Sequence, residues 1–372
     1  MPHFVCDGIK IAGIASAVPE HEVTVDSLES IFGEKAVSKL QALTGVTKFR
    51  KTSENQTASD LGFAAAKHLL ATKDIDSSKI GALVFVSHSV DYRRPATACV
   101  LHKRLGLSQE CAAFDINLGC SAYPYGLFQV ASLMNSSDIN TALLVCAESL
   151  TKLVAPKDRT TAHLFGDCGT ATLLRKADQE EGIRGIVRTD GSGYRAVIVP
   201  AGGFRNRFAS LQELQWPDGN VRSLHDLYMD GPAVFEFTLT QVPDLLNDFL
   251  FNDGQSIEQY DCVALHQANL HILKQIARKL QISTDKVPIS LDRYGNTSSA
   301  SIPLTLCDSY SSRSAPDRIR VLMCGFGVGL SLGVASAEIS IDDLLPVITT
   351  SESFDEGIIN IPMDLQAEEL WI

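Results

Sequence analysis

Short apolar runs alternate with longer amphipathic segments along the chain. The runs lie at 8–18, 81–87, 141–147 and 168–174. They are apolar at nearly every position, which is typical of strands buried on both faces. Between them, residues 56–70 and 95–105 have the apolar spacing of helices, Gly106 provides a stop for the second, and the mixed segment 23–49 predicts helices over a sheet edge. Strands that alternate with helices predict an α/β fold with a mostly parallel sheet.

The segment FDINLGCSAY at 114–123 predicts a short strand, a glycine turn and the first turn of a helix that continues to about Asn135. Cys120 at that helix N-terminus would face unpaired backbone N–H groups and the positive end of the helix dipole. Such a position can lower a cysteine pKa from about 8.5 toward roughly 3.5–7.5. Cys120 is therefore a candidate nucleophile, although a free cysteine is more often a small buried hydrophobe.

Two later segments, CVALHQAN at 262–269 and ISLDRYGNT at 289–297, show the same order of strand, turn and helix. They place His266 and Asn296 where strands end, and catalytic and binding groups in open α/β sheets collect at those ends. Taken singly, His266 is equally typical of a loop histidine, and Asn296 of a helix cap or turn. Together with Cys120 they form a Cys/His/Asn set.

The second half of the chain repeats the first. Residues 83–88 match 261–266 at an offset of 178, because His88 corresponds to His266, and 143–146 match 321–324 at the same offset. Cys120 corresponds in turn to Asn296, at an offset of 176. In a duplicated strand–helix unit the strand ends of both halves can meet across a pseudo-twofold axis, so we expect the three polar residues to lie together.

This repeat divides the chain into three parts. Residues 1–180 carry the candidate nucleophile, residues 181–341 carry the histidine and asparagine, and residues 342–372 form an acidic extension. No Lys or Arg follows Arg320, and we expect the extension, including Trp371, to wrap over the surface. With 372 residues, 45% hydrophobic and 20% charged, the chain is long enough for two sub-domains with a large core.

The net charge of −12 argues against nucleic acid as a partner, because binding to phosphates needs a dominant basic face. Nine scattered cysteines show no metal-type spacing, and no secretory leader is visible, so we expect free thiols in a reducing cytoplasm and no metal site. No apolar run approaches the roughly 20 residues of a membrane helix, which predicts a soluble protein.

Four motifs in order resemble the ketoacyl-acyl-carrier-protein synthase III group of the thiolase superfamily. They are GCSA around Cys120, HQANL from His266, YGNTSSASIP around Asn296 and GFGVGLSLG at 325–333, and the resemblance spans roughly residues 8–341. It implies a five-layered αβαβα fold of two similar halves, a homodimer, and acyl thioesters of CoA or an acyl carrier protein as substrates, with no cofactor.

The resemblance also implies a decarboxylative Claisen condensation. An acyl group would pass from its thioester to Cys120, and a malonyl-type thioester would then lose carbon dioxide. The enolate formed would be stabilised by the imidazole of His266 and the amide of Asn296. Backbone N–H groups of Cys120 and Val328 would form an oxyanion hole for the acyl-enzyme, where relatives often have glycine in place of Val328.

Expected donor and carrier contacts match the family less closely. Lys39 and Leu43 occupy positions where fatty-acid-initiating enzymes have tryptophan and arginine, whereas Asp158-Arg159 fits the family pattern, so Arg159 is a candidate nucleotide contact. Further candidate contacts to the substrate or to an acidic carrier protein are Asn269, Lys274, Arg278 and Lys279. The three basic residues are equally typical of a solvated helix face.

Other activities fit less well. A papain-like protease uses Cys, His and Asn in this order, but its cysteine lies near the mature N-terminus. Hydroxymethylglutaryl-CoA synthases use a glutamate base in the first half, and residues 87–94 contain none. A non-enzymatic subunit would have no reason to keep all three polar residues. An acyltransferase or thioester hydrolase on the same scaffold, passing the acyl group from Cys120 to an amine, hydroxyl or water, remains the alternative.

Overall fold

The computed structural model describes residues 3–313 and 316–355. Six strands form the first sheet, in the order β17, β2, β8, β7, β5 and β6. Their bounds are Ile348–Thr350, Ile9–Pro19, Cys168–Lys176, Thr141–Glu148, Ala82–Val86 and Ala112–Ile116, respectively. Strands β7, β5 and β6 are parallel, whereas β8 is antiparallel to both of its neighbours, β2 and β7.

The prediction of a mostly parallel sheet is confirmed for the first sheet, where only β8 runs against the other strands, and is wrong for the second sheet, where three of the four strand pairs are antiparallel. No α-helix lies between β7 and β8, so the chain reverses and β8 pairs antiparallel with the strand that precedes it. An apolar run reports burial on both faces and does not report strand direction.

The second sheet has the strand order β1, β9, β16, β15 and β14. Their bounds are His3–Asp7, Gly182–Thr189, Ser331–Ser340, Arg318–Gly327 and Cys262–Leu265. The directions from β9 to β14 repeat those from β2 to β5: two antiparallel pairs and then one parallel pair. The N-terminal strand β1 pairs with β9 and so belongs to the sheet built mainly from the second half of the chain.

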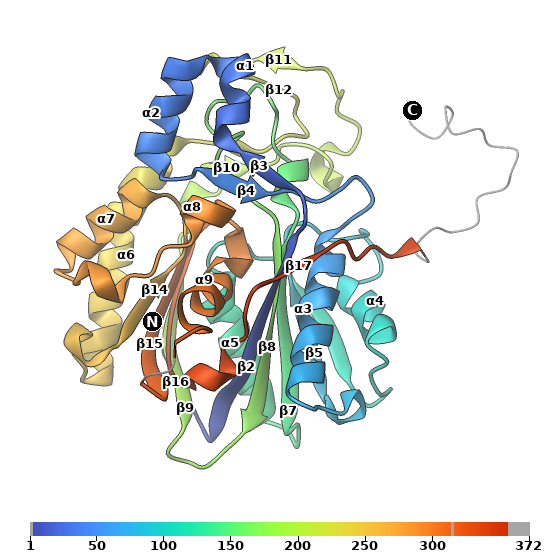
Figure 1. The fold of residues 1–372 in the computed structure, drawn as a ribbon, viewed down its shortest axis with the longest axis vertical. Helices are drawn as coiled ribbons and strands as arrows, with labels where there is room; N and C mark the ends of the chain where they lie inside the picture. Colours follow the sequence, from blue (N-terminus) through green and yellow to red (C-terminus); the bar gives the residue numbers. More distant parts are fainter. Residues whose placement is uncertain (1–2, 314–315, 356–372) are drawn as a thin grey trace, which may run out of the picture.

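Helices complete five layers (Figure 1). Helices α3 (Ala58–Thr72) and α4 (Thr97–Arg104) cover the outer face of the first sheet. Helices α5 (Ala122–Asn135) and α9 (Ser301–Tyr310) lie between the sheets and contact both. Helix α6 (Gly231–Asp253) covers the second sheet, with α7 (Leu270–Lys279) packed against it. The predicted αβαβα arrangement is confirmed.

Smaller elements sit above the ends of the sheets. Segment 23–49 contains the predicted helices as α1 (Glu29–Phe32) and α2 (Glu34–Thr44). The hairpin that flanks them is β3 (Glu22–Thr24) with β4 (Lys48–Arg50), and two further hairpins pair β10 (Val197–Ile198) with β13 (Tyr228–Met229) and β11 (Leu214–Gln215) with β12 (Val221–Arg222). These elements lie at the top of Figure 1.

The strand predicted before Asn296 is absent among the described residues of this segment. The chain forms one helical turn there, α8 (Leu291–Tyr294), and Asn296 makes a single bridge with Phe165. An apolar run this short is compatible with either a strand or a helical turn, and only the packing of Leu291 into the core decides between them.

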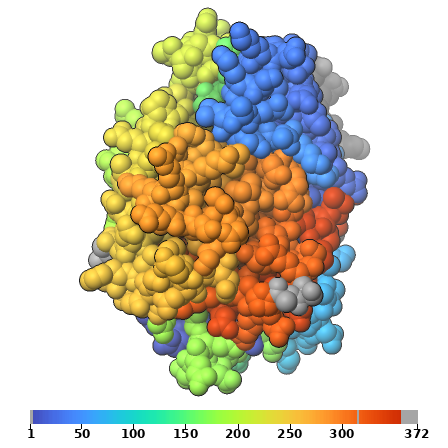
Figure 2. All heavy atoms as spheres, turned by 60° about the vertical axis from the view of Figure 1, so that its left-hand side comes forward, coloured from blue at the N-terminus to red at the C-terminus, as the bar shows by residue number. Residues whose placement is uncertain are grey.

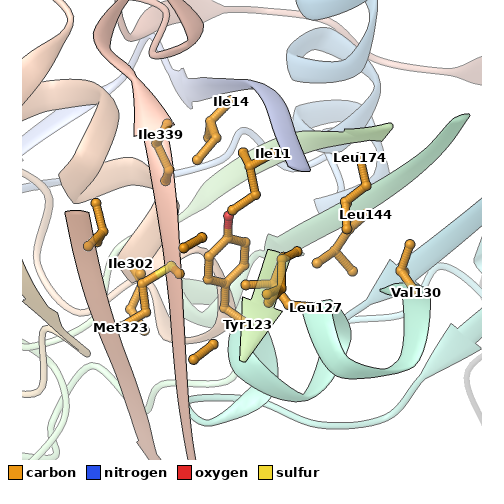
Figure 3. Close-up of a cluster of buried hydrophobic side chains, with 14 of the residues drawn as sticks. Ile11, Ile14, Tyr123, Leu127, Val130, Leu144, Leu174, Ile302, Met323 and Ile339 are labelled. Atoms are coloured by element: carbon orange, nitrogen blue, oxygen red, sulfur yellow. The ribbon is translucent and has the colours of Figure 1, made fainter. Parts of the chain in front are cut away.

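The main core fills the space between the two sheets around Tyr123 of α5 (Figure 3). Ile11 and Leu144 of the first sheet and Met323 and Ile339 of the second converge on it. The Tyr123 hydroxyl hydrogen-bonds with Thr172 Oγ1 at 3.0 Å, so its polar atom is satisfied inside this apolar layer. Helix α5, which begins just after Cys120, is thereby anchored to both halves.

The described part of the acidic extension packs on the first sheet. Strand β17 pairs in parallel with β2, Asp343 forms an ion pair with Lys73, and Glu352 forms one with Arg104. The predicted position of Trp371 on the surface lies outside the described residues.

Candidate active site

Cys120 occupies a tight turn between β6 and α5. The turn is closed by a hydrogen bond from Ala122 N–H to the Gly119 carbonyl, at 2.8 Å. The glycine-rich end of β15 lies directly against it. A Cβ atom on Gly327 would stand 2.6 Å from Cys120 Cβ, and one on Gly325 would stand 2.8 Å from the Cys120 carbonyl oxygen. Glycine is required at both positions because this close approach holds the nucleophile in place.

The expected lowering of the Cys120 pKa is wrong. Burial raises the pKa of the thiol to about 11, and the negative charge of Glu148 acts in the same direction. Hydrogen bonds from Ser298 and from the backbone N–H groups of Val328 and Cys120 oppose this rise without cancelling it. Desolvation of the thiolate therefore outweighs the helix terminus, and the resting residue is a thiol.

His266 follows the last residue of β14. Its N–H donates to the Cys324 carbonyl at 2.8 Å, and its ring meets Phe326 edge-on at a centroid distance of 5.4 Å. The ring Nδ1 hydrogen-bonds with Ser301 Oγ at 2.7 Å. Burial lowers the pKa of the imidazole to about 3, so His266 is neutral over the physiological range.

Asn296 is held by its backbone and by its side-chain oxygen. Its N–H donates to the Leu164 carbonyl at 2.8 Å, and its own carbonyl accepts from Gly166 N–H at 3.1 Å. The side-chain Oδ1 accepts from Ser298 N–H at 2.9 Å. Because the oxygen is engaged inside the protein, the amide hydrogens are the part of this side chain available to a ligand.

Ser298 is a site residue that the sequence interpretation missed. Its Oγ lies 3.6 Å from Cys120 Sγ, its N–H orients Asn296, and its backbone interacts with the His266 imidazole. Its φ of +49° falls in the left-handed region, which costs on the order of 1 kcal/mol for a residue with a side chain. The serine-rich TSSAS run after Asn296 was the available signal, but it does not indicate which hydroxyl faces the cysteine.

Cys120, His266 and Asn296 line one cavity of about 900 Å³, as the duplication predicted. Apolar side chains form most of its wall, among them Leu40 and Leu43 of α2. The cavity is thus wide enough for an acyl chain and a thioester arm, with its few polar groups gathered around the sulfur.

Arg159, Asn269 and Val328 also line this cavity. Arg159 follows Asp158, and the buried guanidinium of Arg222 forms an ion pair with Asp158 at 3.0 Å. This ion pair fixes the loop that carries Arg159. Asn269 additionally caps α7, since its Oδ1 accepts from Ile272 N–H at 2.8 Å.

The three basic residues expected at a carrier contact lie on α7, outside the cavity. Lys274 and Arg278 are exposed, and Lys279 is exposed along its length while its Nζ donates to the Leu239 carbonyl at 2.8 Å. Figure 2 shows the orange surface that includes α7 next to the yellow α6 and below the blue N-terminal segment. This face is accessible beside the elements that form the cavity.

Residues 3–313 and 316–355 contain neither a membrane-spanning helix nor a cluster of metal ligands. No helix there combines the length and apolar character needed to cross a bilayer. No group of three or more His, Cys, Asp or Glu side chains is placed to hold a metal ion.

Family models of 3-oxoacyl-[acyl-carrier-protein (ACP)] synthase III match residues 114–191, and models of its C-terminal part match residues 250–339. A putative 3-oxoacyl-[acyl-carrier-protein] synthase 3 from Campylobacter jejuni is 34% identical over 346 residues, which covers 91% of this chain and 95% of the relative. The chain belongs to the 3-oxoacyl-acyl-carrier-protein synthase III family. A beta-ketoacyl-[acyl-carrier-protein] synthase III from Rhodopirellula baltica is 31% identical, covering 88% of this chain and 97% of the relative.

Solved structures of synthases of this family have the same fold as this chain. A 3-oxoacyl-(acyl-carrier protein) synthase from Burkholderia xenovorans superposes with a TM-score of 0.89 at 36% identity, over 94% of this chain and 99% of its own. The 3-oxoacyl-(acyl carrier protein) synthase III of Pseudomonas aeruginosa superposes with a TM-score of 0.78 at 28% identity, over 92% of this chain and 100% of its own. The predictions of a thiolase-like fold and of a carbon–carbon bond-forming acyltransferase of the synthase III type are confirmed.

Proposed function

We propose that Cys120 is the residue acylated in the first half-reaction. Its sulfur attacks the carbonyl of an acyl thioester of CoA or a carrier protein, the carbon–sulfur bond to the donor breaks, and the thiol proton leaves with the departing thiol. Ser298 Oγ donates to the sulfur as it becomes a thiolate. The N–H groups of Cys120 and Val328, which both face the sulfur, then hold the oxyanion of the tetrahedral intermediate.

In the second half-reaction a malonyl-type thioester loses carbon dioxide. The enolate oxygen accepts hydrogen bonds from the His266 ring and the Asn296 amide, and the enolate carbon attacks the acyl-Cys120 carbonyl. The product is a 3-oxoacyl thioester, and the Cys120 thiolate released as the acyl–sulfur bond breaks takes up a proton from solvent. Two features support these roles: the imidazole is neutral, so it can stabilise the enolate without protonating it, and the Asn296 oxygen is already engaged.

The observation that carries this proposal is the opening of all three side chains into one cavity. His266→Ala and Asn296→Ala should still form acyl-Cys120, detected by peptide mass, and should lose about 10²–10³ in carbon dioxide release from the malonyl thioester. Cys120→Ala should not be acylated. Absence of carbon dioxide release by the wild-type enzyme, with both CoA-bound and carrier-bound malonate, would instead favour a plain acyltransferase or thioester hydrolase.

For the carrier protein we propose docking on the exposed face of α7, with Arg159 contacting the thioester arm or its nucleotide at the cavity. Lys274 and Arg278 are exposed and positively charged, whereas the chain as a whole has a net charge of −12. These two positive charges would attract an acidic partner to this face of α7. Lys274→Glu with Arg278→Glu should raise the KM for carrier-bound malonate and leave that for malonyl-CoA unchanged. Lys67→Glu, on α3 at the opposite outer layer, serves as the control.

We also propose a homodimer that forms through β6. This strand is the edge of the first sheet in the described chain, and its Phe114 is 36% exposed. An apolar, unpaired edge favours antiparallel pairing with the same strand of a second copy about a twofold axis. Sedimentation should give twice the 40.3 kDa chain mass for the wild type and a smaller species for Phe114→Glu. A wild-type monomer at micromolar concentration would contradict this.

A cytoplasmic location is our remaining proposal. All nine cysteines are free, including the exposed Cys99, as expected for a protein that stays in a reducing compartment.

A further inference from the structure

Glu148 is a buried carboxylate whose charge acts on the Cys120 thiol. Glu148, the last residue of β7, is fully buried and accepts hydrogen bonds from several donors at once. Ser89 Oγ donates at 2.9 Å, Ser299 Oγ at 3.2 Å, Ser87 Oγ at 3.3 Å and the His88 N–H at 3.2 Å. Among the described residues no Lys or Arg forms an ion pair with it, so this charge is held by neutral donors alone.

These donors come from both halves of the chain. Ser87, His88 and Ser89 follow β5 in the first half, and Ser299 belongs to the turn after Asn296 in the second. The two segments converge on the residue before the nucleophile: a Cβ atom on Gly119 would stand 2.9 Å from His88 Nδ1 and 3.0 Å from Ser298 Oγ. Glu148 thus connects the two segments whose side chains meet beside Cys120.

Glu148 itself does not line the cavity, whereas His88, Cys120 and Ser298 do. It therefore acts through these residues and not on the substrate. We propose that Glu148 is a positioning residue: it holds the loop at His88 and the turn at Ser298 against Cys120, and its charge limits the reactivity of the thiol. This inference rests on the proposed role of Cys120 as the nucleophile.

The electrostatics are consistent with this arrangement. Burial raises the pKa of Glu148 to about 7, and its charge in turn raises the pKa of Cys120. The other titratable groups near it are the thiols of Cys120 and Cys146, whose pKa values its charge raises, and His88, which contacts it through the backbone N–H and whose ring pKa is lowered by burial. None of these brings a compensating positive charge near pH 7. Protonation of Glu148 below about pH 7 should therefore make the thiol easier to ionise.

The test is the alkylation rate of Cys120 by iodoacetamide between pH 5 and 9, in the wild type and in Glu148→Gln. Peptide mass separates Cys120 from the exposed Cys99. Glutamine can accept from the His88 N–H and donate to the serine hydroxyls, so it removes the charge and keeps the shape. The variant should react faster at pH 8–9, by about tenfold for each pH unit that the Cys120 pKa falls. The ratio of the two rates should approach one below pH 6, where wild-type Glu148 is neutral.

Asp167→Asn is the matched control. Asp167 is also a fully buried carboxylate that accepts four hydrogen bonds, from the N–H and hydroxyl groups of Thr52 and Thr151, but it is not among the main groups that shift the Cys120 pKa. Its ratio to the wild type should be the same at every pH. A Glu148→Gln ratio that is below one or constant with pH, or a pH-dependent ratio in Asp167→Asn, would overturn the proposal.

Ser299→Ala is a second variant that tests the same proposal if Glu148→Gln does not fold. It retains the charge and removes one donor that lowers the pKa of Glu148, so the bend near pH 7 in the wild-type alkylation profile should move to higher pH. An unmoved bend would count against the role of Glu148. Because alkylation reads the thiol directly, failure here is distinguishable from failure of the proposed condensation, which acyl transfer from acyl-CoA to Cys120 tests separately.

Discussion

Replacing Glu148 by Gln should change how the stability of the protein depends on pH. The pKa of this buried carboxyl is raised from 4.5 to about 7 in the folded protein. Between these values the folded state keeps a proton that the unfolded chain releases. The free energy of unfolding therefore falls as pH rises through this window, and above pH 7 the full loss applies. A shift of this size corresponds to roughly 3 kcal/mol, since each pKa unit is worth about 1.4 kcal/mol.

The variant has no such proton. The difference in unfolding free energy between Glu148→Gln and wild type should therefore shift in favour of the variant by roughly 2–3 kcal/mol between pH 5 and pH 8. Urea denaturation followed by circular dichroism, at equal protein concentration, measures this difference at both pH values. Glu213→Gln, at an exposed carboxylate paired with Lys157, is the control for removing a surface charge. Parallel pH profiles for Glu148→Gln and wild type would refute the reasoning, because they would mean that Glu148 is ionised as readily inside the protein as in the unfolded chain.

Three further predictions concern the site and its support. Gly327→Ala should nearly abolish acylation of Cys120 in the peptide-mass assay, because the added Cβ would stand 2.6 Å from Cys120 Cβ; a fully acylated variant would contradict the close packing. Carbon dioxide release by pre-acylated enzyme should follow the same pH profile in wild type and His266→Gln, at a lower rate in the variant, since the His266 pKa of about 3 means that no imidazolium forms above about pH 4. Arg222→Met should lower the free energy of unfolding by roughly 3–5 kcal/mol in urea denaturation, because it leaves the buried Asp158 without its partner; a loss below 1 kcal/mol would show that water reaches the carboxylate.

Much of the fold was predictable because the relevant signals are local. The apolar run before Ser87 became β5, the periodic segment after Thr57 became α3, and the pattern after Asn269 became α7. The offset between the halves also indicated that Cys120 and His266 would meet, since a duplicated strand order brings equivalent strand ends together. Periodicity, caps and internal repeats are properties of the chain itself, so they can be read without knowing its contacts.

Other features depend on distances between residues far apart in sequence. Strand direction in the β7–β8 pair depended on the path of the connection, and the turn before Asn296 depended on the packing of Leu291. The pKa of Cys120 likewise depended on residues far from it in sequence. Its place before α5 favours a lowered pKa, but enclosure by the second half of the chain and the charge of Glu148 raise it. Desolvation and Coulomb interactions act through space, so only the tertiary structure sets their sign and size.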